Sequence, residues 1–136
     1  MSTYCEKYGS RRLTLFPTRV PVPEIQIDVK TKYGFAKQWF LVDTGADITM
    51  LPFHSSEWLD CRLLKKKARV FGIDGAGVTV HASTITIRIG DQEENVRCVF
   101  SRRDDIPFIL GRLDILKSYD IHFLKDRLCL KRRVER

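Results

Sequence analysis

The chain has 136 residues, of which 43% are hydrophobic and 30% charged, and these values are typical of one soluble globular domain with its own core. No apolar run approaches the roughly 20 residues of a transmembrane helix, and the polar residues 1–9 lack the apolar segment of a secretory signal, so we expect a cytoplasmic protein without membrane contacts. The net charge of +7 is most simply that of a solvated surface, because no nucleic-acid-binding motif accompanies the basic clusters.

The four cysteines lie far apart in the sequence and form no C-x-x-C pair; they are Cys5, Cys61, Cys98 and Cys129. Zinc sites usually bring such pairs together, so we expect neither a metal site nor a cofactor. Reduced thiols are the default expectation for a cytoplasmic chain, although the sequence leaves a disulfide open.

The N-terminal residues 1–20 are polar and predict an irregular arm. Pro21 and Pro23 then mark the entry into a folded domain, which we expect to extend over residues 21–131. The last residues, 132–136, form a basic tail. We therefore expect a single domain with two short appendages.

The first predicted hairpin joins residues 24–30, which alternate strictly between apolar and polar side chains, to residues 35–42. Residues 31–34 predict the turn between them. A short helical turn is expected near residues 55–59. The hairpin ends at Asp43.

A second, longer hairpin is predicted from residues 68–71 and 78–89, of which the latter alternate over most of their length. Between them, residues 72–77 contain three glycines, and this composition favours either a plain turn or a mobile lid over a ligand. A turn near residues 90–93 leads to a further strand at 95–100.

The C-terminal third begins with an apolar strand at residues 106–111, which ends in glycine. Residues 112–119 have the spacing of a short amphipathic helix. A last hairpin is expected from residues 120–124 and 127–130. With about eight strands and one helix, the predicted fold class is mainly β.

The triplet Asp43-Thr44-Gly45 carries the most information about function. It follows the apolar residues 39–42, so a carboxylate stands at the end of a buried strand, where it is costly unless it is paired, hydrogen-bonded or protonated. The Thr44 hydroxyl can form hydrogen bonds and Gly45 allows a sharp turn. We expect this loop to hold the carboxylate rigidly in a cleft.

Three features in chain order resemble the aspartic proteases, specifically the single-domain retroviral-type family (retropepsins). The matching segments are residues 41–47, the glycine-rich tip at 71–77, and residues 109–112. The resemblance covers roughly residues 23–131. It implies a retropepsin-like closed β-barrel with one short C-terminal helix, assembled as a two-fold dimer, and it implies an aspartic endopeptidase that acts on peptides or proteins.

The chemistry of this class requires two carboxylates, one as the base that activates water and one as the acid that polarises the peptide carbonyl. The two share one proton because their like charges repel each other. Family members with two domains carry two Asp-Thr/Ser-Gly triplets, whereas this chain has one. The resemblance therefore implies a site built from Asp43 of two identical chains, without a metal, cofactor or nucleic acid.

Further roles follow from the resemblance alone. Thr44 would form a hydrogen bond across the dimer, and Gly45 would offer its carbonyl group to the substrate backbone. Asp47 would pair with Arg112 near the dimer interface, where Gly111 ends the preceding strand. The implied substrate-binding residues are Leu41, Asp47, Gly72, Ile73, Asp74, Gly75, Pro107 and Ile109.

Two departures keep an alternative open. Asp74 places a charge in the tip, and the chain continues after the predicted helix as a hairpin, where retroviral members end in a short interleaving strand. A non-catalytic member that uses the same fold to bind peptides or to dimerise is therefore the second hypothesis. A basic nucleic-acid-binding barrel would leave Asp43 without a role, and no serine or cysteine forms a nucleophile motif with a histidine.

Overall fold

The protein was analysed as a computed structural model, which describes residues 3–71 and 77–134. Within these residues twelve strands and one 3₁₀ helix are present, so the fold is mainly β, as predicted. The largest sheet has seven strands in the order β4-β5-β10-β6-β9-β8-β7. In chain order these are β4 (Glu24–Thr31), β5 (Gly34–Val42), β6 (Thr49–Pro52), β7 (Lys67–Phe71), β8 (Gly77–Ile89), β9 (Gln92–Ser101) and β10 (Ile109–Leu110).

The large sheet curls back on itself, because β4 also pairs with β8 through Asp28↔Arg88 and Val29↔Ile87. Its inner face carries the core. In β4 and β8, the apolar residues of the alternating sequence pattern face this core, and the residues between them lie on the outer face. The core side chains on these two strands are Ile25, Ile27, Val29, Ile85, Ile87 and Ile89, each at most 2% exposed.

All three predicted hairpins are present, and the last joins Tyr119–Phe123 to Arg127–Arg132. In β4–β5 the register runs to Thr31↔Gly34, which leaves a two-residue turn, and in β7–β8 it runs to Phe71↔Gly77. The residues between Phe71 and Gly77, which include the predicted substrate contacts Gly72, Ile73, Asp74 and Gly75, lie outside the described residues. The helical turn expected near residues 55–59 is a 3₁₀ helix, η1, at Phe53–Glu57.

The short helix predicted for residues 112–119 is wrong. The segment is a series of turns, in which two hydrogen bonds have the i→i−4 spacing of an α-helix, from Leu116 N to Arg112 O (3.0 Å) and from Tyr119 N to Ile115 O (2.9 Å). The interruption is Asp114, whose φ of 66° lies in the left-handed region. An α-helix does not continue through that conformation.

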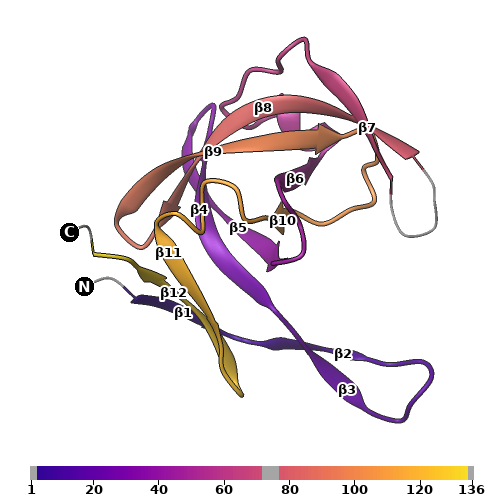
Figure 1. Cartoon of the computed structure of the whole chain (residues 1–136), viewed down its shortest axis with the longest axis vertical. Coiled ribbons are helices and arrows are strands. Elements are labelled where there is room, and N and C mark those ends of the chain that lie inside the picture. Colours follow the sequence, from indigo (N-terminus) through magenta and orange to yellow (C-terminus); the bar gives the residue numbers. More distant parts are fainter. Residues whose placement is uncertain (1–2, 72–76, 135–136) are drawn as a thin grey trace.

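The expectation of an irregular N-terminal arm is also wrong. β1 (Thr3–Lys7) pairs with β12 (Arg127–Arg132), which pairs with β11 (Tyr119–Phe123) in a three-stranded sheet. β2 (Gly9–Arg12) and β3 (Arg19–Val22) form a separate two-stranded hairpin that projects from the body (Figure 1). The polar composition of this region predicted a loop, but its strands form through backbone pairing, which needs few apolar side chains.

The expectation of reduced thiols fails for one pair of cysteines. Cys5 and Cys129 stand opposite each other in the β1–β12 register and form a disulfide, whereas Cys61 and Cys98 are free. Disulfides of this kind persist in oxidising surroundings. Among the described residues, no helix has the length and apolar character needed to cross a membrane.

Candidate active site

The loop that carries Asp43 is fixed by backbone hydrogen bonds. Asp43 N donates to Leu110 O (3.0 Å), and Ala46 N donates to Asp43 O (3.1 Å). Gly45 N donates to Asp43 Oδ1 at 3.0 Å, so the carboxylate is oriented by its own loop. A Cβ atom at position 45 would lie 3.2 Å from that oxygen, which explains why glycine suits this turn.

The short strand β10 places this loop within the sheet. It lies between β5 and β6, parallel to β5 through Ile109↔Leu41 and antiparallel to β6 through Ile109↔Met50. Asp43, directly after β5, therefore lies beside Gly111, directly after β10. Two segments more than 60 residues apart in the sequence, as the resemblance implied, are brought together here.

Gly111 is required by a close approach of two backbones. A Cβ atom there would lie 2.5 Å from the Ile48 carbonyl carbon and 2.8 Å from Thr49 N, closer than nonbonded atoms approach. Gly111 N also donates to Thr49 Oγ1 (3.0 Å), and the Thr49 side chain is fully buried. The glycine thus allows the loop after Asp43 to pack directly on the end of β10.

Asp47 and Arg112 form an ion pair across these same two segments. Backbone bonds reinforce it, since Arg112 N donates to Ala46 O (3.0 Å) and Leu113 N donates to Asp47 O (2.9 Å). The Asp47 side chain is 83% exposed in the single chain, so the ion pair alone adds little to folding stability.

Asp43, Thr44 and Gly45 are exposed, which differs from the expected cleft. The last buried residue of β5 is Val42, at 4% exposure, and the chain leaves the core at the next residue. A single chain therefore supplies one oriented carboxylate at its surface.

A cavity of about 660 Å³ adjoins this loop. The loop side contributes the backbone and side chains of residues 45–48, and the opposite wall comes from β7, β8 and β9. Its described lining residues are Gly45, Ala46, Asp47, Ile48, Met50, Ala68, Val70, Val78, Val80, Val99, Ser101, Arg103 and Ile106. Most of these side chains are aliphatic, so the cavity suits an apolar group.

Three predicted substrate-binding residues are not among the described residues of this cavity. Leu41 and Ile109 are half-buried neighbours in the sheet, and Pro107 is exposed in the loop that precedes β10. Sequence reasoning missed the aliphatic wall of Val70, Val78 and other residues from β7–β9. The alternation of Val78 and Val80 was the available signal, but a pattern of period two does not tell which face meets the cavity.

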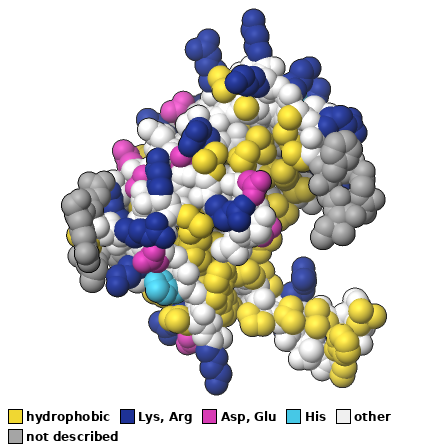
Figure 2. Space-filling model, viewed as in Figure 1, with side chains coloured by type: hydrophobic (Ala, Val, Ile, Leu, Met, Phe, Trp, Pro, Cys, Tyr) yellow, Lys and Arg dark blue, Asp and Glu magenta, His cyan; other side chains and the backbone are white. Residues whose placement is uncertain are grey.

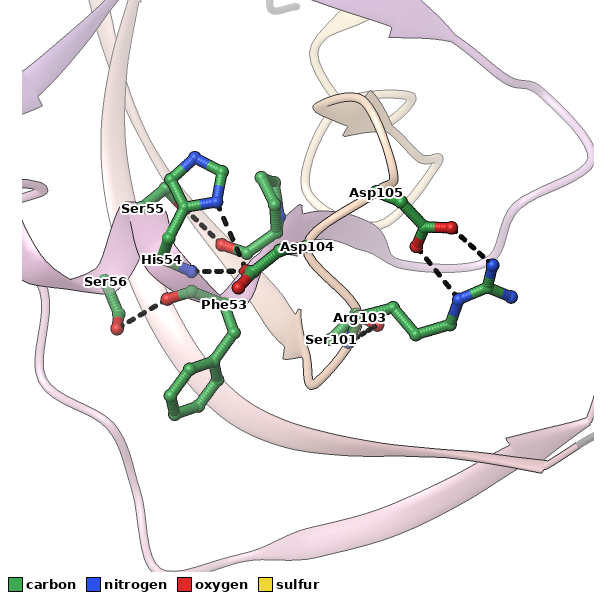
Figure 3. Close-up of polar contacts among 9 residues, drawn as sticks. Phe53, His54, Ser55, Ser56, Ser101, Arg103, Asp104 and Asp105 are labelled. Carbon is green, nitrogen blue, oxygen red and sulfur yellow. Dashed lines mark hydrogen bonds and ion pairs between the residues drawn. The ribbon is translucent and has the colours of Figure 1, made fainter.

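Polar contacts hold the loop after β9 at the rim of the cavity (Figure 3). Asp104 Oδ1 accepts a hydrogen bond from His54 N (2.7 Å) and thereby ties this loop to η1. Arg103 pairs with Asp105 through Nε (3.0 Å) and Nη2 (2.6 Å). The hydrogen bonds from the Arg103 guanidinium lower the pKa of Asp105 from its ordinary value, so the rim carries a fixed pair of opposite charges.

The sequence model of a protein family described as aspartyl protease matches residues 27–112. A retropepsin-like aspartic protease from Rickettsia conorii has a similar structure, with a TM-score of 0.61, 18% identity and coverage of 96% of this chain and 99% of that chain. EIAV protease, solved in complex with the inhibitor HBY-793, matches with a TM-score of 0.55, 23% identity and coverage of 71% and 86%, respectively. Comparison with curated proteins gives no match. The two structural similarities establish a retropepsin-like fold.

Proposed function

The chain belongs to the aspartyl protease family, and from this premise we propose that it is an endopeptidase whose active site contains Asp43 from each of two identical chains. The observation that carries the proposal is the Asp43 loop. It presents one carboxylate, oriented by the N–H of Gly45, at the surface of a chain with a single Asp-Thr-Gly triplet.

One carboxylate cannot serve as base and acid in the same step. When two carboxylates lie together, their repulsion retains one proton between them, so one activates a water and the other donates a hydrogen bond to the substrate carbonyl. Exposure of Asp43 in the single chain fits this proposal, since a two-fold partner would cover the loop. The aliphatic cavity beside the loop would then receive an apolar side chain of the substrate, next to the bond that is cleaved.

Removal of the Asp43 charge tests the mechanism. We expect Asp43→Asn to lower the rate of hydrolysis of a mixed peptide library at mildly acidic pH by at least about a hundredfold, because the amide can neither accept nor share the proton. Light scattering should show the same dimer as for wild type. Asp60→Asn is the matched control, because Asp60 is an exposed aspartate paired with Lys30 at 3.7 Å.

Wild-type hydrolysis by the Asp43→Asn variant would contradict the mechanism. Wild-type protein that binds peptides from the library without cleaving any of them would instead favour the alternative, a non-catalytic peptide-binding or dimerisation module.

A further inference from the structure

The hairpin formed by residues 9–22, here named the arm, is detached from the rest of the fold. Among the residues that the structure describes, β2 and β3 pair only with each other, from Gly9↔Val22 to Arg12↔Arg19. They continue the directions of β1 and β4 beyond the body (Figure 1). A two-stranded hairpin on its own is marginally stable in water, so a projecting one calls for a partner surface.

The end of the arm is apolar and exposed. Leu15 is 86% and Phe16 63% exposed, and together with Leu13 and Pro17 they surround a shallow cleft. Figure 2 shows hydrophobic side chains at the end of the arm, which is separated from the body by a hollow. A surface of this kind in a projecting segment is typical of a protein contact site.

Internal hydrogen bonds give the arm a defined shape. Leu13 N donates to Thr18 O (3.0 Å), Thr18 N donates to Phe16 O (2.7 Å), and Arg19 Nε donates to Ser10 Oγ (2.8 Å). The arm is therefore organised before it meets a partner, which lowers the entropy lost on binding.

The base of the arm lies beside the candidate active site. Val42 N donates to Pro23 O (2.8 Å), one residue before Asp43 and one residue after the arm ends. From Pro23 the arm extends over about seven residues, or roughly 20 Å at 3.3 Å per residue. This reach exceeds the radius of gyration of about 14 Å expected for a domain of this length. A second chain that meets Asp43 therefore lies close to the base of the arm.

The C-terminal strand has no free edge for a partner. β12 is the central strand of its own three-stranded sheet, with β1 on one side and β11 on the other. The disulfide between Cys5 and Cys129 fixes β1 in that place. An interleaved terminal strand would require this sheet to open, so an element other than β12 is the better candidate for a contact between two copies.

We propose that the arm docks on a second copy of this chain, with the tip residues Leu15 and Phe16 covered by the body of that copy. The inference rests on the proposed function, because the need for a second Asp43 is what brings the second copy to the base of the arm. In a two-fold pair each arm reaches over the other chain, and the contact occurs twice.

Substitution of the tip tests the inference. We expect Leu15→Ser with Phe16→Ser to raise the dimer dissociation constant, measured by sedimentation, by about tenfold or more. Activity at protein concentrations that saturate the dimer should equal that of wild type, because the tip does not touch Asp43. Tyr33→Ser is the matched control, since Tyr33 is 95% exposed and precedes β5, at the end opposite Asp43.

A photo-reactive amino acid at position 16 gives a second measurement that does not depend on affinity. Irradiation should cross-link two chains that carry the photo-reactive residue at position 16, and should not cross-link two chains that carry it at position 33. An unchanged dissociation constant in the double variant, or no cross-link between chains from position 16, would overturn the inference while the proposed function stands. Wild-type protein that cleaves peptides as a monomer would contradict the proposed function itself.

Discussion

At the scale of single residues, Asp114 determines the conformation after β10. Its side chain is 5% exposed and accepts hydrogen bonds from Arg97 N, Nε and Nη2, each at 2.9 Å. Lys117 Nζ lies 3.5 Å from Oδ1. The hydrogen bonds from Arg97 outweigh the effect of burial and hold the pKa of Asp114 well below its ordinary value of 3.8. These bonds stabilise a left-handed residue where the sequence pattern predicts a helix.

The depressed pKa of Asp114 makes stability depend on pH. Because the folded-state pKa is lowered, the contribution is complete above the unfolded value of 3.8 and is lost as the pH falls below it toward the folded-state value. We expect Asp114→Asn to lower the free energy of unfolding by about 2 kcal/mol at neutral pH, because the amide offers a single acceptor atom. Asparagine tolerates the left-handed conformation, so backbone strain does not contribute to the difference in free energy of unfolding between wild type and Asp114→Asn.

Urea denaturation at several pH values measures this effect. The difference between wild type and Asp114→Asn should shrink below pH 3.8. The exposed Asp105, which also pairs with an arginine, provides the control Asp105→Asn, for which we expect little change. A difference that stays constant down to the lowest accessible pH would show that the charge of Asp114 is not the cause.

At the scale of elements, strand pairing at the edge of the core, to which β12 contributes Leu128 and Leu130, ties the two ends of the chain together. β1 joins β12 over a sequence separation of 124 residues at the disulfide. The fold thus begins and ends in one small sheet, and the arm starts from it. This arrangement replaces the free terminal strands that the resemblance to retroviral proteases led us to consider.

Loss of the disulfide should weaken the fold without disturbing the core, since Cys5 is exposed. We expect Cys5→Ser to lower the free energy of unfolding by about 2–4 kcal/mol, because a cross-link over a long loop restricts the unfolded chain. Reductant should lower the free energy of unfolding of wild type to the value of Cys5→Ser, and it should not change that of Cys5→Ser itself. The control variant Cys61→Ser should respond to reductant as wild type does. Mass spectrometry that finds four alkylated thiols in unreduced wild type would contradict the disulfide.

At the scale of the whole molecule, one chain presents a single Asp43 carboxylate, which is half of the catalytic pair in the proposed dimer. Asp43 is exposed, the aliphatic cavity lies beside it, and the arm ends next to it. All three features lie where the proposed second copy would meet the first.

Mixing experiments test whether the site is shared. If each active site takes Asp43 from both chains, wild type mixed with Asp43→Asn should lose activity as the square of the wild-type fraction. In an equal mixture, random pairing leaves about one quarter of the dimers with two intact loops. The fraction of active dimers is measured as the activity per total protein, once the subunits have had time to exchange. A linear fall would show that one chain is sufficient.

Some features of the structure could be read from short stretches of sequence. The alternation in residues 24–30 and 78–89 predicts β4 and β8, because the side chains of a strand point alternately to its two faces. The apolar run before Asp43 and the glycine after it predict a strand that ends in a tight turn. These inferences hold because each depends on neighbouring residues only.

The amino-acid sequence by itself thus determined the mainly β class, the hairpins, and a single aspartate loop whose family resemblance points to proteolysis. The tertiary structure alone decided that β1 pairs with β12, that Cys5 meets Cys129, that Arg97 holds Asp114 in a left-handed conformation, and that Asp43 stands exposed beside the base of the arm. The physical reason is that alternation and turn preferences act between neighbours, whereas strand partners, ion pairs and exposure depend on how distant segments pack together.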